Sequence, residues 1–260
     1  MRGGRWGGAG GSGAAPGARL TRRDFLRAGL VGGAGAAALL TTGRLHGSPR
    51  PRSGPSYGFL VDLTKCIGCG ACVRACAAEN EVPAGFFRTW IERYTVLRDG
   101  RVLVDSPEGA FNGFAGDPPL GGDVARSYFV PKLCNHCEDS PCVQVCPVGA
   151  SYVSPEGVVL VDRKHCVGCG YCVQACPYGC RYISPKGYAD KCTFCYHRVA
   201  KGLKPACVAA CPVGARVFGD LAQPASPVRR IMDVSRYGVL KAHLGTHPKC
   251  FYVGLGQEVI

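Results

Sequence analysis

Cysteines are the residues of this chain with the clearest chemistry. Sixteen of the eighteen cysteines fall into four groups of four along the 260 residues. The first and third groups share the spacing C-x2-C-x2-C-x3-C, and the second and fourth widen the gap before their third cysteine. The groups are Cys66, Cys69, Cys72, Cys76; Cys134, Cys137, Cys142, Cys146; Cys166, Cys169, Cys172, Cys176; and Cys192, Cys195, Cys207, Cys211. This spacing is the one by which a backbone wraps a 4Fe-4S cube, so it predicts an electron-transfer protein.

The spacing has a geometric reason. Three thiolates two residues apart lie on a tight loop and reach three iron corners of one cube, which leaves the fourth cysteine out of reach. In the two-cluster bacterial ferredoxin pattern the fourth cysteine starts a helix toward a second cluster, so each group gives three ligands to one cube and one to its partner's. Proline follows the fourth cysteine in three groups, as Pro147, Pro177 and Pro212, and its fixed φ suits the start of a helical turn. Ala77 stands at that place in the first group.

Two other uses of paired cysteines fit less well. A structural zinc ion needs four sulfurs and no third cysteine at the x2 spacing. Disulfides could staple a secreted chain, but C-x2-C-x2-C crowds three sulfurs where only two can pair. Cys180 and Cys250 lie outside the groups, and we expect them to be small buried hydrophobes.

Charge and composition agree with a cluster protein. The net charge is +13, but the first 56 residues hold nine of the 31 Lys and Arg residues and only one of the 18 Asp and Glu residues. Four oxidised cubes with their thiolates would add roughly −2 each, so the cluster-bearing part would be near neutral, and nucleic-acid binding is not indicated. The 38 glycines and 19 prolines describe a loop-rich chain organised around clusters. Basic residues near the cysteines would offset cluster charge or stay solvated: Arg74, Arg163, Lys164, Arg181 and Lys191.

Short strands are predicted to position the cysteine loops. Apolar runs at 57–61 and 158–161 precede the first and third groups, and the runs 150–153, 181–184 and 215–219 follow a fourth cysteine. Strand, cluster loop, short helix and strand, repeated, give an α+β fold of the ferredoxin type. Asp62 and Asp162 stand just before a cluster loop, where ordinary turn chemistry is the favoured role.

The amino-terminal segment resembles a twin-arginine export signal. Arg22 and Arg23 are followed by Phe25, Leu26 and a weakly apolar run from Ala28 to Leu40 that is too short to span a membrane. Because that route carries folded proteins, cluster insertion in the cytoplasm and a final place at the outer, periplasmic face of the cytoplasmic membrane are both consistent with it. No later run is long enough to span a membrane, so any attachment must come from a partner.

The cysteine segments resemble a known family, the four-cluster electron-transfer (beta) subunit of molybdopterin oxidoreductases. The resemblance covers residues 57–220 in detail and is closest to the B subunits of tetrathionate and polysulfide reductases. The matching segments are CIGCGACVRAC, CNHCEDSPCVQVCP, CVGCGYCVQACPYGCRYI, CTFCYHRVAKGLKPACVAACPVGAR and the closing VLKAHLGTHPKCFYVGL.

The resemblance implies how the groups pair. The first group pairs with the fourth and the second with the third, giving four 4Fe-4S cubes in two interleaved bacterial-ferredoxin-like modules. The ligand sets it implies are Cys66, Cys69, Cys72 with Cys211; Cys192, Cys195, Cys207 with Cys76; Cys134, Cys137, Cys142 with Cys176; and Cys166, Cys169, Cys172 with Cys146. No cysteine is missing, so His136 and His197 are expected to be packing or hydrogen-bonding residues that at most tune potentials.

The expected organisation follows from these pairings. It has a signal region, a linker, an outer module in two pieces, an insert, an inner module and a tail: 1–45; 46–56; 57–98 and 186–220; 99–127; 128–185; and 221–260. Scattered aromatics from Phe86 to Phe114 are expected to pack the insert, with docking as the less favoured role.

The resemblance also implies a function. It implies electron relay between a multi-span membrane quinol-oxidising subunit and a molybdopterin (Mo or W) catalytic subunit, with no substrate chemistry in this chain. A free-standing soluble ferredoxin shuttle is the alternative.

Overall fold

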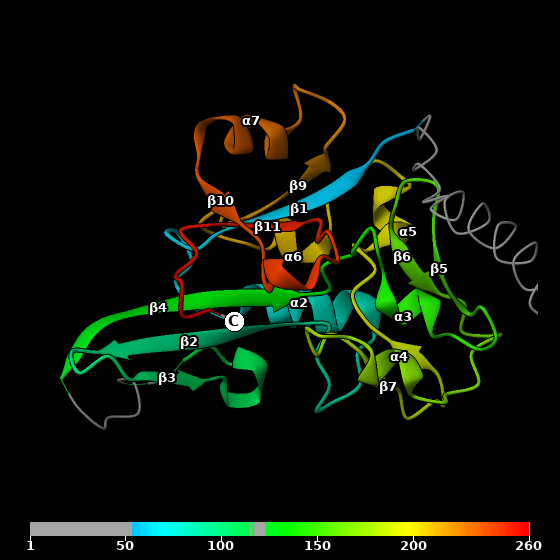
Figure 1. Cartoon of the computed structure of the whole chain (residues 1–260), viewed down its shortest axis with the longest axis horizontal. Helices are drawn as coiled ribbons and strands as arrows, with labels where there is room; N and C mark the ends of the chain where they lie inside the picture. The colour runs from blue at the N-terminus through cyan, green and yellow to red at the C-terminus, as the bar shows by residue number, and fades with distance from the viewer. Residues whose placement is uncertain (1–53, 115, 117–122, 260) are drawn as a thin grey trace, which may run out of the picture. The chain divides into compact units, whose positions relative to one another are not determined.

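The structure, a computed structural model, describes residues 54–114, 116 and 123–259, and the predicted signal region lies outside them. The described part is a loop-rich mixture of short helices and sheets, of the ferredoxin-like α+β kind. Its cysteine loops are held by two sheets and two small hairpins (Figure 1).

The first sheet joins strands from both ends of the described residues. β1 (Tyr57–Asp62) lies between β9 (Arg216–Asp220), which is antiparallel to it, and β11 (Cys250–Val253), which is parallel. β10 (Tyr237–Gly238) closes the other edge of β11. Because β1 precedes the first cysteine group and β9 follows the fourth, this pairing brings the flanks of those two groups together. The predicted strands at 57–61 and 215–219 are therefore confirmed within one residue at each end.

The second sheet is built from the segment between the first two cysteine groups. β2 (Thr89–Leu97) pairs with β3 (Val102–Asp105) on one side and with β4 (Val124–Leu133) on the other. A single 3-10 turn, η1 (Pro107–Ala110), follows β3. Aromatic side chains pack onto one another along this sheet, as Tyr94 does on Tyr128, with ring centroids 5.7 Å apart. The predicted packing role of the aromatics is supported by these contacts.

Two hairpins flank the third cysteine group, and the sequence repeats their turn. β5 (Ser151–Val153) pairs with β6 (Val159–Val161), and β7 (Tyr182–Ile183) pairs with β8 (Ala189–Asp190). Each turn has the sequence Ser-Pro-x-Gly, at 154–157 and 184–187, and its glycine N–H donates to the serine carbonyl at 2.9 and 2.8 Å. Proline at the second position and glycine at the fourth are the residues this turn favours.

Every cysteine group has a short helix, which begins earlier than the sequence predicts. α2 (Ala71–Asn80), α3 (Pro141–Gln144), α4 (Tyr171–Gln174) and α6 (Ala206–Ala209) each carry the third cysteine of a group. Only α2 is long enough to include the fourth. The expectation that the fourth cysteine starts the helix is therefore wrong. In the last three groups the fourth cysteine and the proline after it (147, 177 or 212) instead begin a turn. The N–H of the glycine at 149, 179 or 214 closes this turn by donating to the carbonyl of Cys146, Cys176 or Cys211.

The remaining helices are short as well. They are α5 (Tyr196–Val199), α7 (Pro227–Val234) and the 3-10 turn η2 (Ala242–Leu244). Among the residues the structure describes, no helix has the length and apolar character needed to cross a membrane.

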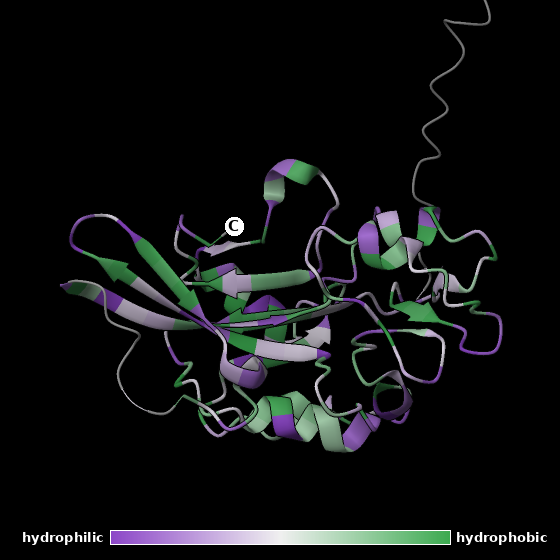
Figure 2. Ribbon diagram, turned by 90° about the horizontal axis from the view of Figure 1, so that it is seen from below, coloured by the Kyte–Doolittle hydropathy of each residue, from purple (hydrophilic) through white to green (hydrophobic). Residues whose placement is uncertain are grey.

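Buried cysteines are part of the apolar core, which has a larger cluster and a smaller one around Cys142 and Cys172. In the larger cluster, Phe59, Ile91 and Phe194 are buried beside Cys72, Cys192 and Cys207. Figure 2 shows hydrophobic residues on the strands and on α2 interspersed with hydrophilic ones. The fold therefore buries many of the predicted cluster ligands within the core, while others are half-buried and Cys169 is exposed.

Candidate iron-sulfur sites

The first and third cysteine groups share a loop that requires glycine. Gly70 and Gly168 have φ of 71° and 68°, a region that L side chains rarely adopt. A Cβ atom on Gly70 would lie 2.2 Å from the Ala110 carbonyl oxygen, and one on Gly168 would lie 2.5 Å from that of Gly187. The two loops can therefore turn tightly enough to bring their cysteines together, and each is closed by backbone from another segment.

The first group meets the last cysteine of the fourth group around one cavity. This cavity is lined by Cys66, Cys69, Cys72 and Cys211, together with Ile91 and Arg216. β9 follows Cys211 and pairs with β1, which explains how residues far apart in the sequence come to share it. These are the four cysteines of one ligand set that the resemblance implies.

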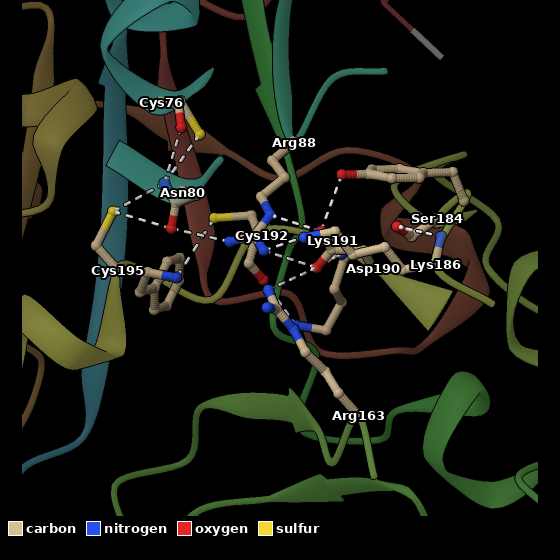
Figure 3. A network of polar contacts seen from close by, with 12 residues as sticks. Cys76, Asn80, Arg88, Arg163, Ser184, Lys186, Asp190, Lys191, Cys192 and Cys195 are labelled. Carbon is tan, nitrogen blue, oxygen red and sulfur yellow. Dashed lines mark hydrogen bonds and ion pairs between the residues drawn. The ribbon is translucent and has the colours of Figure 1, made fainter. Parts of the chain in front are cut away.

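A second cavity has the complementary arrangement. Its walls include Cys192, Cys195, Cys207 and, from α2, Cys76. Asn80, one turn after Cys76, directs its side-chain amide at the Sγ atoms of Cys76 and Cys195, both 3.6 Å away (Figure 3). The helix α2 thus supplies Cys72 to one cavity and Cys76 to the other.

A third set is brought together between the second and third groups. The Cys137 thiol interacts electrostatically with Cys134, Cys142 and Cys176, and burial raises its pKa to about 12. Cys134, Cys137 and Cys142 are buried and Cys176 is half-buried. The predicted partner cysteine of the third group therefore lies beside the second group.

The last predicted set lies nearer the surface. Cys172 is buried on α4, Cys146 and Cys166 are half-buried, and Cys169 is exposed. The helix α4 contacts α3, which Cys146 follows by two residues. The structure thus places the third group next to the end of the second.

Backbone N–H groups point at several of these sulfurs. Ser151 donates to the Sγ of Cys146 at 3.4 Å, and Ala189 donates to the Sγ of Cys166 at 3.3 Å. The amides of His136 and Phe194 lie 3.5 and 3.4 Å from the Sγ of Cys134 and Cys192. Hydrogen bonds to thiolate sulfur stabilise its negative charge and tune a bound cluster.

Buried cations stand among the thiols. Arg181 and Lys191, which the sequence predicted to offset cluster charge or remain solvated, are buried, whereas Arg163 is exposed. Sequence analysis missed Arg216, which is buried and interacts with Cys66, Cys72 and Cys207. The signal was available, since Arg181 and Arg216 both end the repeat C-P-x-G-x-R, at 176–181 and 211–216.

The donor set fits an anionic iron-sulfur group. Burial raises the pKa of the Cys66 and Cys207 thiols to about 11, so these sulfurs stay protonated unless a positive partner binds them. Within the described residues, Nη1 of Arg216 and Nε and Nη2 of Arg181 are buried donors without a hydrogen-bond partner. Thiols in fours, next to unused cationic donors, are what a thiolate-ligated cluster would satisfy.

The residues near the cysteine groups that were not predicted to be ligands have the turn, packing and hydrogen-bonding roles expected of them. Asp62 Oδ1 accepts hydrogen bonds from the Thr64 amide and hydroxyl, and Asp162 Oδ1 accepts from the Lys164 amide, which is turn chemistry. Cys180 and Cys250 are buried in the core. His136 is buried, accepts from the Val159 amide and packs on Phe194, whereas the exposed His197 pairs with Glu79 at 2.8 Å.

Comparisons with known proteins agree with this chemistry. Two families, each described as a 4Fe-4S dicluster domain, match residues 65–150 and 125–221. The B subunit of tetrathionate reductase from Salmonella typhimurium is 43% identical over 84% of this chain and 78% of its own length. The same subunit from Archaeoglobus fulgidus is 47% identical over 78% and 84%. The B chain of polysulfide reductase from Wolinella succinogenes is 39% identical over 76% and 93%.

Together the fold and the matches define a protein with two 4Fe-4S dicluster domains, which correspond to four 4Fe-4S clusters. The protein belongs to the family of iron-sulfur electron-transfer subunits that includes the B subunits of tetrathionate and polysulfide reductases.

Proposed function

We propose that this chain relays electrons between a membrane quinol-oxidising subunit and a molybdopterin catalytic subunit of a tetrathionate- or polysulfide-type reductase. The relatives are named as single subunits of reductases, which supports a place inside a complex over a free-standing ferredoxin. A 4Fe-4S cluster supplies reversible one-electron transfer, and the protein's own residues bind it, bury it and set its potential.

The proposed ligands form four sets, each made of three cysteines of one group and the fourth of another. They are Cys66, Cys69, Cys72, Cys211; Cys76, Cys192, Cys195, Cys207; Cys134, Cys137, Cys142, Cys176; and Cys146, Cys166, Cys169, Cys172. The observation that carries the proposal is the pair of cavities, one lined by the whole first set and the other by the whole second set. Sets that draw on groups one and four, and on groups two and three, amount to two interleaved modules.

Arg181 and Arg216 would offset the charge of bound clusters, and the neutral Asn80 amide would donate hydrogen bonds to thiolate sulfur. Arg88 is buried, donates to Asn80 Oδ1 at 2.8 Å and pairs with Asp190 at 2.8 Å (Figure 3). It thereby orients the Asn80 amide toward Cys76 and Cys195. Such fixed donors cost no reorganisation when charge arrives, which favours fast transfer.

We also propose that the protein is exported folded by the twin-arginine route and works at the outer face of the cytoplasmic membrane, attached there by a partner subunit. The support is the Arg22-Arg23 segment, which lies outside the described residues. Attachment through a partner is consistent with the relatives, which are named as subunits of larger reductases.

An anaerobic affinity purification from native membranes tests the function. The full chain would carry a C-terminal tag, and the eluate would be assayed for iron, molybdenum and tungsten and for partner masses. Co-purification of a large pterin protein and a multi-span membrane protein is expected. A protein that carries its full iron content yet elutes alone from the soluble fraction would instead be identified as a soluble ferredoxin.

Processing at the amino terminus is a separate test. Arg22→Lys with Arg23→Lys is expected to leave the assembled protein in the cytoplasm, because twin-arginine export depends on the arginine pair. Arg2→Lys with Arg5→Lys is the matched control, outside the pair. Unchanged export of the double-lysine variant at 22 and 23 would rule out this route.

A further inference from the structure

Arg181 and Arg216 occupy equivalent positions in two cysteine groups. Each is the fifth residue after a group's fourth cysteine, in Cys176-Pro-Tyr-Gly-Cys-Arg181 and Cys211-Pro-Val-Gly-Ala-Arg216. Both side chains are buried, with 5% and 3% of their surface exposed. A buried charge is costly unless something compensates it, so two such arginines at matching positions need a partner.

Oxygen acceptors satisfy only part of each guanidinium. Arg216 Nη2 donates to Thr89 Oγ1 at 2.9 Å, and Arg181 Nη1 donates to Ser151 Oγ at 2.9 Å. In the described part of the chain, Arg216 Nη1 and Arg181 Nε and Nη2 have no hydrogen-bond partner. No carboxylate forms an ion pair with either arginine among the described residues. Their charge is therefore left for another anion.

The sulfurs around each arginine belong to two different ligand sets. Arg216 lines the cavity of Cys66, Cys72 and Cys211 and also interacts with Cys207 of the neighbouring cavity. Arg181 interacts with Cys134 and Cys142 of one set and with Cys172 of another. Each arginine thus stands at the boundary between the two sets of one module.

We propose that Arg216 and Arg181 each place a fixed positive charge between the two clusters of one module. Each arginine thereby raises the reduction potentials of both clusters. The inference rests on the proposed ligand sets. A cluster gains one negative charge on reduction, and a fixed nearby cation in a partly screened interior favours that state. A cation shared by two clusters also moves both potentials together, which keeps the electron-transfer step between them near balance.

The fit is specific to a cation with several donors. Arg carries five N–H groups in a planar fork, so it can keep its hydrogen bond to Thr89 or Ser151 and still direct other N–H groups at sulfur. Lysine keeps the charge but loses the fork. Substitution by lysine, which keeps the charge, and by glutamine, which removes it, therefore separates the effect of charge from that of hydrogen bonding.

A redox titration of the full-length assembled protein, monitored by electron paramagnetic resonance, tests the proposal. In Arg216→Gln, two of the four clusters are expected to become harder to reduce, with equilibrium constants lower by about tenfold, or about 59 mV for one electron. In Arg181→Gln, the other two are expected to shift. Arg216→Lys and Arg181→Lys should recover most of each shift. Lys164→Gln removes an exposed charge two residues from Cys166 and should move no potential by that amount.

Some outcomes overturn the inference alone. If Arg216→Gln keeps its full iron content and all four potentials stay unchanged, the arginine does not set them. If both Gln variants shift the same pair, the arginines do not belong to separate modules. Iron well short of four clusters in the unmutated protein would instead overturn the ligand sets, and with them this inference.

A second variant covers the case in which a Gln substitution prevents cluster assembly. Thr89→Val and Ser151→Ala each remove the one side-chain oxygen that holds a guanidinium, without touching its charge. Each should shift the same pair of clusters as the corresponding Gln variant, by a smaller amount. Unchanged potentials in an iron-replete Thr89→Val protein count against the positioning of Arg216.

Discussion

His136 stacks on Phe194 with ring centroids 3.6 Å apart and an angle of 26° between the ring planes. Each is the second residue between the first two cysteines of its group, at the place where the first and third groups have Gly68 and Gly168. Both are buried and hold positive φ, 43° and 54°. The stacked rings therefore join the loop of Cys134 and Cys137 to the loop of Cys192 and Cys195, and their contact offsets the backbone strain of two non-glycine residues.

Loss of the Phe194 ring should destabilise both loops. Phe194→Ala removes a buried ring that also packs on Phe59 and Phe218, and a cost of about 3–5 kcal/mol is expected. Thermal release of iron, measured as the loss of visible absorbance, should occur at a lower temperature than in the unmutated protein. Val234→Ala, at an 84% exposed position on α7, is the control. Equal release temperatures for the two variants would show that the stack contributes little.

The Asn80 amide should tune one cluster. Asn80→Asp replaces a donor to the Cys76 and Cys195 sulfurs with a carboxylate, so the proposed cluster there should become harder to reduce. The expected result is a lower midpoint potential for one of four signals in a redox titration. Asn112→Asp makes the same change at an exposed asparagine and should leave every potential in place. A uniform shift of all four would point to a global effect.

The buried pair of Arg88 and Asp190 should show strong coupling. Arg88→Met removes the bidentate partner of the buried Asp190 carboxylate, which keeps Tyr182 and a 3.9 Å contact with Arg163, and is expected to cost up to about 3 kcal/mol in the free energy of unfolding. The double variant Arg88→Met with Asp190→Leu should be closer to the unmutated protein than either single variant. Denaturant unfolding of the assembled protein under anaerobic conditions gives all four values. Additive losses would mean that the two residues act independently.

Gly70 should be intolerant of any side chain. Gly70→Ala forces a Cβ to within 2.2 Å of the Ala110 carbonyl oxygen, so the loop of Cys66 and Cys69 must move. We expect the protein to lose about one cluster of iron in a colorimetric assay. Gly85→Ala has a similar φ of 80° but open space around its Cβ, so it isolates the conformational cost, roughly 1–2 kcal/mol. Full iron in both variants would show that the loop can yield.

The proposed ligand sets predict which cysteine replacements matter. Cys211→Ser should alter the spectrum of one cluster, the one proposed for Cys66, Cys69 and Cys72, because serine is a poorer iron ligand than a thiolate. Cys180→Ser changes a buried cysteine outside the sets and should leave four clusters. Electron paramagnetic resonance of the reduced proteins distinguishes them. Loss of a cluster in Cys180→Ser would revise the sets.

The features that the sequence predicts best are those whose chemistry is local. Cysteine spacing requires only a short stretch of backbone, so the four groups and the turns at Asp62 and Asp162 could be predicted from neighbouring residues. The strands at 57–62, 151–153 and 216–220 also follow from short apolar runs. Helix starts were less predictable, because the third cysteine enters a helix that Gly70 or Gly170 begins in a left-handed conformation.

Long-range relationships needed the tertiary structure. The sequence by itself determined that sixteen cysteines stand in four cluster-binding patterns. The family resemblance implied that Cys211 joins Cys66, and the tertiary structure brings the two to one cavity. Only the tertiary structure decided that Arg216 and Arg181 are buried between sets of thiols and that His136 meets Phe194. Such contacts join residues far apart in the sequence or depend on burial, and both are set by how the sheets pack, which no local pattern of residues encodes.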